Sequence, residues 1–110
     1  MSAFYIRTGS GWMQYYFTLI ANNNEVILKS EMYTSKSGAQ VGIQSVKANA
    51  PYDGRYERKR SSDLKYYFVL RAANGEKIGV SEMYNSQAAM ENGIQAVKTT
   101  APSAQVVDKT

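Results

Sequence analysis

The chain has 110 residues, which fits one domain, and its 44% hydrophobic and 20% charged residues are ordinary for a globular protein. It contains no cysteine and no histidine, which excludes disulfides and the usual ligands of zinc, haem and iron–sulfur sites, and removes the commonest general base. The formal net charge is +4, no apolar run could span a bilayer, and the first residues do not resemble a secretory signal. We therefore expect a cytoplasmic protein without a membrane partner, and no cofactor, metal or catalytic residue is predicted.

Short strands separated by turns are predicted for the first thirty residues. β-type runs cover residues 4–7, 15–21 and 26–30, and the second run is rich in aromatic side chains. Three asparagines at 22–24 join the second run to the third. Asparagine enters the left-handed conformation of a tight hairpin more readily than other non-glycine residues, so this turn is predicted to be a hairpin.

A helix is predicted next. Ser35 is a natural N-cap, Lys47 complements the helix dipole in the last turn, and Pro51 ends the helix. Apolar residues follow at helical spacing: Ala39, Ile43, Val46 and Ala50. Gly42 lies in mid-helix, where glycine costs about 1 kcal/mol relative to alanine. Its position beside the apolar stripe predicts a close approach between the helix backbone and the sheet, with approach of a ligand as the alternative.

A basic stretch follows the helix. Five cations stand there against two acids: Arg55, Arg58, Lys59, Arg60 and Lys65 against Glu57 and Asp63. This stretch carries most of the net charge. It is either a solvated connector or a segment that attracts the phosphates of a nucleic acid.

The rest of the chain repeats the first part. A shift of 51 residues aligns the chain with itself without a gap, and about half of the positions from Tyr5 to Pro51 are then identical. The matches include Tyr-Tyr-Phe at 15–17 and 66–68, and Ser-Glu-Met-Tyr at 30–33 and 81–84. Two segments this similar are expected to share one backbone structure.

The second copy accordingly predicts a strand that starts near residue 55, an aromatic strand from 66 and a strand over 77–81. Asn74 and Gly75 would supply the two positive-φ residues of a tight hairpin turn between the last two strands. Ser86 is the predicted N-cap of the second helix, whose apolar stripe is Met90, Ile94, Val97 and Ala101. Gly93 repeats the mid-helix glycine, Pro102 ends the helix, and residues 104–107 could add a short final strand.

Two copies solve a problem that one copy could not. A unit of about fifty residues rarely builds a sufficient core by itself, and it leaves a sheet edge unpaired. We therefore predict an α+β fold in which tandem β3-α(-β) repeats form one antiparallel sheet with both helices on one face, related by a pseudo-twofold axis. Residues 1–110 form a single domain, with repeat 1 at about 3–52, repeat 2 at about 54–103 and a tail at 104–110. The internal repeat predicts a monomer.

The repeated motif resembles a known family. The second copy has Asn-Gly-Glu at 74–76, Ser-Glu-Met-Tyr-Asn-Ser at 81–86, Gly-Ile at 93–94, Val-Lys at 97–98 and Ala-Pro at 101–102. This pattern is similar to the YegP-like domain of bacteria and archaea, and the first copy departs from it at Asn24, where the family turn usually has glycine. The resemblance covers about residues 3–102. It implies β3-α-β units joined in one sheet, with exchange of C-terminal strands as an option, and it implies neither a function nor any binding residue.

The two faces of the predicted sheet differ in chemistry. Strand alternation places Phe17, Leu19, Phe68 and Leu70 toward the helices. The opposite face is predicted to present a candidate macromolecule-binding set: Tyr5, Arg7, Tyr16, Tyr56, Arg58, Tyr67 and Arg71. Three interpretations of this set are open: cross-strand neighbours with a structural role only, a protein contact, and a platform for single-stranded nucleic acid.

An enzyme or a small-ligand protein is the remaining hypothesis. Glu31 and Glu82 are paired by the repeat, and two carboxylates about 5–10 Å apart across a cleft could perform glycosidase-type chemistry. The repeated Ser30 and Ser35 have no base beside them in the sequence to activate them. A non-enzymatic binding or interaction module is therefore the predicted class.

Overall fold

The computed structural model describes residues 2–110. Its elements run in the order β1 (Ala3–Thr8), β2 (Tyr15–Ile20), β3 (Val26–Ser30), α1 (Lys36–Asn49), η1 (Asp53–Arg55), β4 (Tyr56–Arg60), β5 (Tyr66–Arg71), β6 (Lys77–Val80), α2 (Gln87–Thr100), η2 (Ala101–Ser103) and β7 (Gln105–Asp108). The strands and helices agree with the predicted ones within a few residues.

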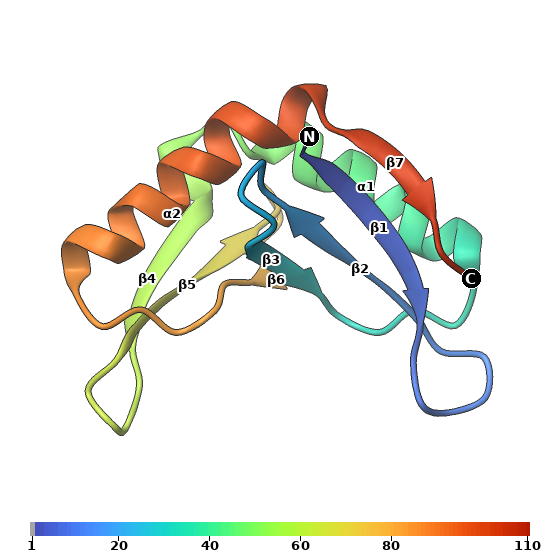
Figure 1. Ribbon diagram of the computed structural model, residues 1–110, viewed down its shortest axis with the longest axis horizontal. Coiled ribbons are helices and arrows are strands. Elements are labelled where there is room, and N and C mark those ends of the chain that lie inside the picture. Colours follow the sequence, from blue (N-terminus) through green and yellow to red (C-terminus); the bar gives the residue numbers. More distant parts are fainter. Residues whose placement is uncertain (1) are drawn as a thin grey trace.

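All seven strands form one sheet in the order β4-β5-β6-β3-β2-β1-β7. The two halves meet at the antiparallel pair β3–β6, which is the centre of the pseudo-twofold arrangement. The sheet is mostly antiparallel rather than wholly so, because β7 runs parallel to β1. The predicted strand at the C-terminal tail is confirmed, and it is exchanged between the repeats: β7 follows the second helix but pairs with the first strand of the chain (Figure 1).

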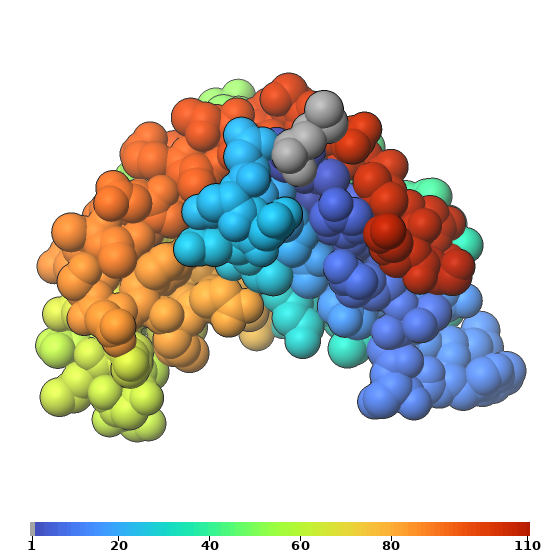
Figure 2. Space-filling model, in the orientation of Figure 1, coloured from blue at the N-terminus to red at the C-terminus, as the bar shows by residue number. Residues whose placement is uncertain are grey.

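Both helices pack on one face of the sheet and share a single core. The predicted stripes of α1 and α2 are buried: Ala39, Ile43, Val46, Ala50, Met90, Ile94, Val97 and Ala101. They meet the inward side chains of the sheet, among which Phe17, Leu19, Phe68 and Leu70 have no exposed surface, as predicted. On the side of the sheet away from the helices, two hairpin loops project on either side of a hollow (Figure 2).

The helix N-caps are confirmed in both repeats. The Oγ atom of Ser35 accepts a hydrogen bond from Gly38 N at 3.0 Å, and that of Ser86 accepts one from Ala89 N at 3.1 Å. Each cap satisfies one of the backbone donors that a helix start leaves free.

The mid-helix glycines make room for tyrosine rings. A Cβ atom added at Gly42 would lie 2.7 Å from Cζ of Tyr33, and one added at Gly93 would lie 2.7 Å from Cζ of Tyr84. The predicted close approach exists, but the neighbour is mainly the tyrosine that precedes each helix; at Gly42 the ring of Phe17 also comes within 2.9 Å. The two tyrosines stack in turn on Phe17 and Phe68, so the helix, tyrosine and sheet form three layers.

The serine of each Ser-Glu-Met-Tyr segment forms hydrogen bonds with backbone groups. Phe17 N donates to Ser30 Oγ at 2.9 Å, and Ser30 Oγ donates to the carbonyl of Glu31 at 2.8 Å. Ser81 repeats this arrangement with Phe68 N at 3.0 Å. The repeated serine is therefore explained by the need to pair a buried N–H group.

The turn of the second hairpin differs from the prediction. Gly75 has a φ of 88°, but Asn74 is not among the positive-φ residues within 2–110, so the expected pair of positive-φ residues is wrong. Gly75 N donates to Ala72 O and Ala72 N donates to Glu76 O, which describes a three-residue loop with one left-handed position. In the first hairpin Asn24, with a φ of 66°, takes that position, as its left-handed tolerance predicted.

The first strands of the two repeats are out of step by one residue. Thr8 pairs with Tyr15 in the first hairpin, whereas Arg60 pairs with Tyr66 in the second, because loop 61–65 is one residue shorter than loop 9–14. The gapless shift of 51 therefore fails before residue 66, and Phe4 rather than Tyr5 is the structural counterpart of Tyr56. Aromatic contacts agree, since Phe4 lies edge-on to Phe17 and Tyr56 lies edge-on to Phe68.

This slip overturns part of the predicted open face. A shift of one residue turns every side chain of a strand to the other face. Tyr56 is only 5% exposed, in the core beneath the helices, and its hydroxyl donates to Ala50 O at 2.7 Å. Arg58 lies opposite Phe68 on the same inward face and reaches Glu91 of α2. Placing Tyr56 and Arg58 on the open face was therefore wrong.

Candidate functional site on the open sheet face

The structure brings three of the predicted residues together on the open face of the first half. Tyr5 and Arg7 alternate with the buried Phe4 and Ile6 on β1, and Arg7 pairs directly with Tyr16 of β2. Tyr67 and Arg71 lie on the open face of the second half, as predicted by the same alternation. Of the seven predicted residues, three thus lie on the open face of the first half, two on that of the second half, and Tyr56 and Arg58 on the inward face.

Two further cations join the first surface. Lys29 of β3 lies over the ring of Tyr16, with Nζ 5.1 Å from the ring centroid, and Lys109, just after β7, lies 5.6 Å from that of Tyr5. The guanidinium of Arg7 stands 5.3 Å from the same Tyr5 ring. We name Tyr5, Arg7, Tyr16, Lys29 and Lys109 the cationic face. Each cation is within the distance at which an aromatic ring attracts a positive charge.

No carboxylate neutralises the cationic face. Among residues 2–110, none of Arg7, Lys29 and Lys109 forms an ion pair within 4.0 Å. The face also contains a shallow depression of about 430 Å³, lined by Tyr5, Arg7, Ile20, Asn24 and Lys109. The first half therefore combines uncompensated positive charge with a concave surface.

Thr18 of β2 lies in the middle of this face. It pairs with Tyr5 of β1 on one side and with Lys29 of β3 on the other. Thr18 is 7% exposed, and its Oγ1 atom has no hydrogen-bond partner among residues 2–110. Its counterpart in the second half is Val69, which is 4% exposed, so the position is occupied there without a hydroxyl.

The open face of the second half contains an acid that pairs with its cations. Glu57, the structural counterpart of Tyr5, accepts from Arg71 at 2.8 Å and lies 3.8 Å from Lys59. The hydrogen bond from Arg71 is the main reason that the pKa of Glu57 is lowered. The open face of the second half thus has tyrosine and cations, but its charges are already paired.

The basic stretch 55–65 is a structural edge rather than a connector. Arg58 donates to Glu91 at 2.6 Å and to Asp53 at 2.9 Å, and Lys98 of α2 donates to Asp53 at 2.8 Å. Hydrogen bonds from Lys98 and then Arg58 lower the pKa of Asp53 to about 2, and burial is the main cause of the raised pKa of Tyr56 nearby. Within the basic stretch, Arg58 forms ion pairs with both Asp53 and Glu91, and it thereby links the edge strand β4 to α2.

The glutamates considered for catalysis are exposed. Glu31 pairs with Lys77 at 2.8 Å across the boundary between the repeats. Tyr84 has a pKa raised first by burial and then by the charges of Glu25 and Glu82. Within residues 2–110 no three His, Cys, Asp or Glu side chains group closely enough to hold a metal ion.

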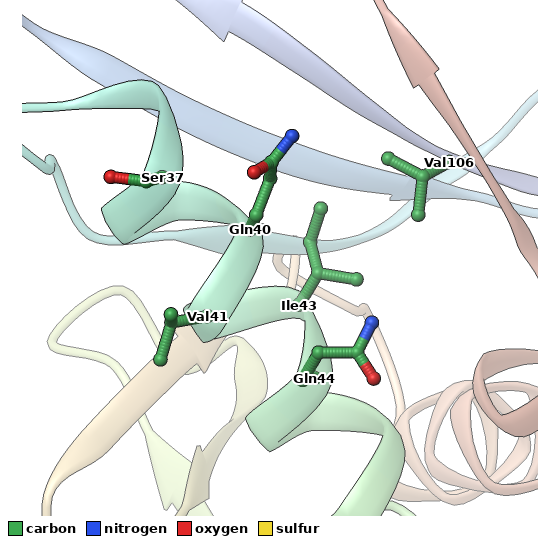
Figure 3. A pocket seen from close by; sticks show the side chains of 6 residues that line it. All are labelled: Ser37, Gln40, Val41, Ile43, Gln44 and Val106. Carbon is green, nitrogen blue, oxygen red and sulfur yellow. The ribbon is translucent and has the colours of Figure 1, made fainter.

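A second surface depression lies on the helix side. It has a volume of about 420 Å³ and is lined by Ser37, Gln40, Val41, Ile43, Gln44 and Val106. Figure 3 shows Gln40, Ile43 and Gln44 projecting from α1 on the side where Val106 of β7 lies. The residues that line it are uncharged, so it does not add to the positive surface described above.

Sequence reasoning missed Lys29 and Lys109. Strand alternation applied to β3 could have placed Lys29 beside Thr18, had the β2–β3 pairing been drawn. Nothing in the sequence near Lys109 indicates that β7 crosses to β1, where Lys109 N donates to Ile6 O at 2.8 Å. Long-range pairing is what assembles this face.

Comparison with known proteins identifies the family. A domain described as a domain of unknown function, DUF1508, matches twice, over residues 13–57 and 61–108. The chain belongs to the UPF0339/YegP family. A UPF0339 protein of Bordetella pertussis is 51% identical over 110 residues, which are all of this chain and 98% of the relative. YegP of Escherichia coli K12 is 48% identical over 97 residues, 88% of each protein.

Solved structures of this family share the fold. The solution NMR structure of a Shewanella oneidensis UPF0339 protein has a TM-score of 0.90 and 43% identity, and the match covers 97% of this chain and 90% of that one. The solution NMR structure of YegP from E. coli has a TM-score of 0.92 and 45% identity, with 99% and 93% covered. The similarity thus extends over the whole tandem arrangement. Neither helix of the part described here is long and apolar enough to cross a membrane.

Proposed function

We propose that this chain is a small non-enzymatic binding module whose cationic face holds an anionic macromolecule. The observation that supports the proposal is the set of three cations, Arg7, Lys29 and Lys109, that have tyrosine rings beneath them and no acidic partner among residues 2–110. We place the module in the cytoplasm, where chains without disulfides are common.

Two positive charges share one aromatic partner on this face. Arg7 and Lys109 stand 5.3 and 5.6 Å from the centroid of the Tyr5 ring. A phosphate or carboxylate bound beside this ring would be attracted by both charges together. In the second half the carboxylate of Glu57 already supplies this negative charge.

Two matched triple variants test the proposal. The first, Arg7→Gln/Lys29→Gln/Lys109→Gln, neutralises the cationic face. The second, Lys59→Gln/Arg71→Gln/Lys77→Gln, removes the same charge from cations that pair with Glu57 and Glu31. Retention on a heparin column measures affinity for a generic polyanion, and circular dichroism checks the fold.

We expect the first variant to elute at clearly lower salt than the wild type and the second to elute close to it. Equal losses in the two variants would show that retention depends on net charge alone, and the proposed site would be abandoned.

A further inference from the structure

We infer that the anion bound by the cationic face is a single-stranded nucleic acid, an inference that rests on the proposed function and names the partner class. The surface offers two kinds of group side by side, cations and aromatic rings. Proteins that bind single strands combine these two groups, because phosphates pair with cations while bases stack on the rings.

The tyrosines are placed for stacking. Tyr5 and Tyr16 come from neighbouring strands and are half-buried, and each ring has a long, mobile cationic side chain over it that a base could displace or stack against. A base can lie against such a ring and be sandwiched by the guanidinium of Arg7, whose planar group stacks as well as pairs with phosphate. Tyr5 and Tyr16 are diagonal neighbours, so two successive bases could be held.

Other polyanions would use only half of these groups. An acidic peptide pairs with the cations but has no large aromatic faces to lay on Tyr5 and Tyr16. A duplex hides the faces of its bases within its own stack, so the rings could not reach them. A single strand is the partner that makes use of both.

The number of cations gives a salt dependence. If three phosphates are neutralised, the logarithm of the binding constant should fall with the logarithm of salt concentration with a slope of about −2, since each phosphate contributes about −0.7 for a single strand. Replacing Lys29 with Gln should reduce the slope by about one third.

The experiment uses tyrosine variants that keep every charge. Fluorescence anisotropy with a labelled oligouridylate and a labelled oligothymidylate measures binding to the wild type, to Tyr5→Leu/Tyr16→Leu and to the matched control Tyr67→Leu. Tyr67 is the counterpart of Tyr16 in the second half, where Glu57 pairs with the cations. A duplex of the same length, poly-glutamate and vesicles with anionic lipid serve as competitors.

We expect the double variant to weaken oligonucleotide binding by about tenfold or more, because each stacked base is worth a several-fold to hundredfold change in affinity. Its elution from heparin should match the wild type. Tyr67→Leu should bind as the wild type does. Tyr16→Phe, which keeps the ring, should retain binding even if Tyr5→Leu/Tyr16→Leu perturbs the sheet.

The outcomes separate the two proposals. If the tyrosine variants bind oligonucleotide like the wild type while Arg7→Gln/Lys29→Gln/Lys109→Gln does not, the anion-binding function stands and the single-strand inference is overturned. Competition by duplex, poly-glutamate or vesicles at equal strength overturns it too and assigns the face to that partner. If the cation variant loses neither heparin nor oligonucleotide binding, the proposed function itself fails.

Discussion

The open faces of the two repeats are built on the same backbone but differ in whether their cations have an acidic partner. In the first half Arg7, Lys29 and Lys109 are unpaired within the described residues, whereas in the second half Glu57 binds Arg71 and Lys59. Tyr16 and Tyr67 occupy equivalent places in both. The difference therefore comes from a few exchanged side chains rather than from the fold.

The comparison shows how a duplicated domain can divide its tasks. The inner faces of the repeats keep the same tyrosine, glycine and serine contacts, because both halves need them for the common core. The outer faces are free of that need and have diverged. Similarity between the halves therefore indicates a structural role, and the divergence on the open face is where the proposed binding site differs between them.

The shared interior gives the largest expected effect. Gly42→Ala should destabilise the protein by about 1–3 kcal/mol, because the added methyl overpacks against Tyr33 and Phe17, although helix propensity alone favours alanine by about 1 kcal/mol. Gly93→Ala should cost less, since only the Tyr84 ring is close. Urea denaturation of both variants measures the difference, and equal or stabilising effects would contradict the crowding argument.

The Thr18/Val69 position should give the next largest effect. Thr18→Val removes a buried hydroxyl without a partner and should raise the free energy of unfolding by about 1 kcal/mol, while Val69→Thr should lower it by about 1–3 kcal/mol. The two exchanges are nearly equal in volume, so packing is not the cause. Stability changes of the same sign in both variants would show that Thr18 has a partner in solution.

Glu57 is predicted to lower the affinity of the second half for polyanions. Glu57→Gln frees Arg71 and Lys59 beside Tyr67, and it should raise polyanion affinity several-fold with little change in stability, because exposed ion pairs contribute only about 0–1 kcal/mol. Heparin retention and anisotropy measure the gain. The matched control is Glu25→Gln, which changes net charge equally at an exposed glutamate that does not pair with Arg71 or Lys59. A similar gain from that control would assign the effect to net charge.

The smallest effect concerns pH. The pKa of Asp53 is lowered to about 2, so its ion pairs stabilise the folded state above the ordinary aspartate pKa of about 4 and this contribution is lost as the pH falls toward 2. Asp53→Asn should therefore lower the melting temperature at pH 6 and have little effect at pH 2. Lys47, the counterpart of Lys98, donates to the carbonyl of Ala104 instead, so it does not contribute to an ion pair of this kind. A constant difference between wild type and variant from pH 6 to pH 2 would count against this network.

Much of the fold could be read from local patterns. The helix stripes, the caps at Ser35 and Ser86 and the special position of Gly42 and Gly93 depend on residues a few positions apart, and each is found where it was predicted. The candidate face was only partly predictable. Tyr5, Arg7, Tyr16, Tyr67 and Arg71 lie on the open side, whereas Tyr56 and Arg58 do not.

The sequence by itself determined the duplication, the order of strands and helices and the buried side of each helix, because periodicity and repetition are properties of neighbouring residues. Only the tertiary structure decided the facing of β4 and the crossing of β7 to β1. A strand alternates with a period of two, so one residue fewer in loop 61–65 exchanges its faces, and its charged sequence has no apolar alternation to reveal the change. Lys29 and Lys109 likewise meet Tyr16 and Tyr5 through pairing between distant segments, which local patterns do not encode.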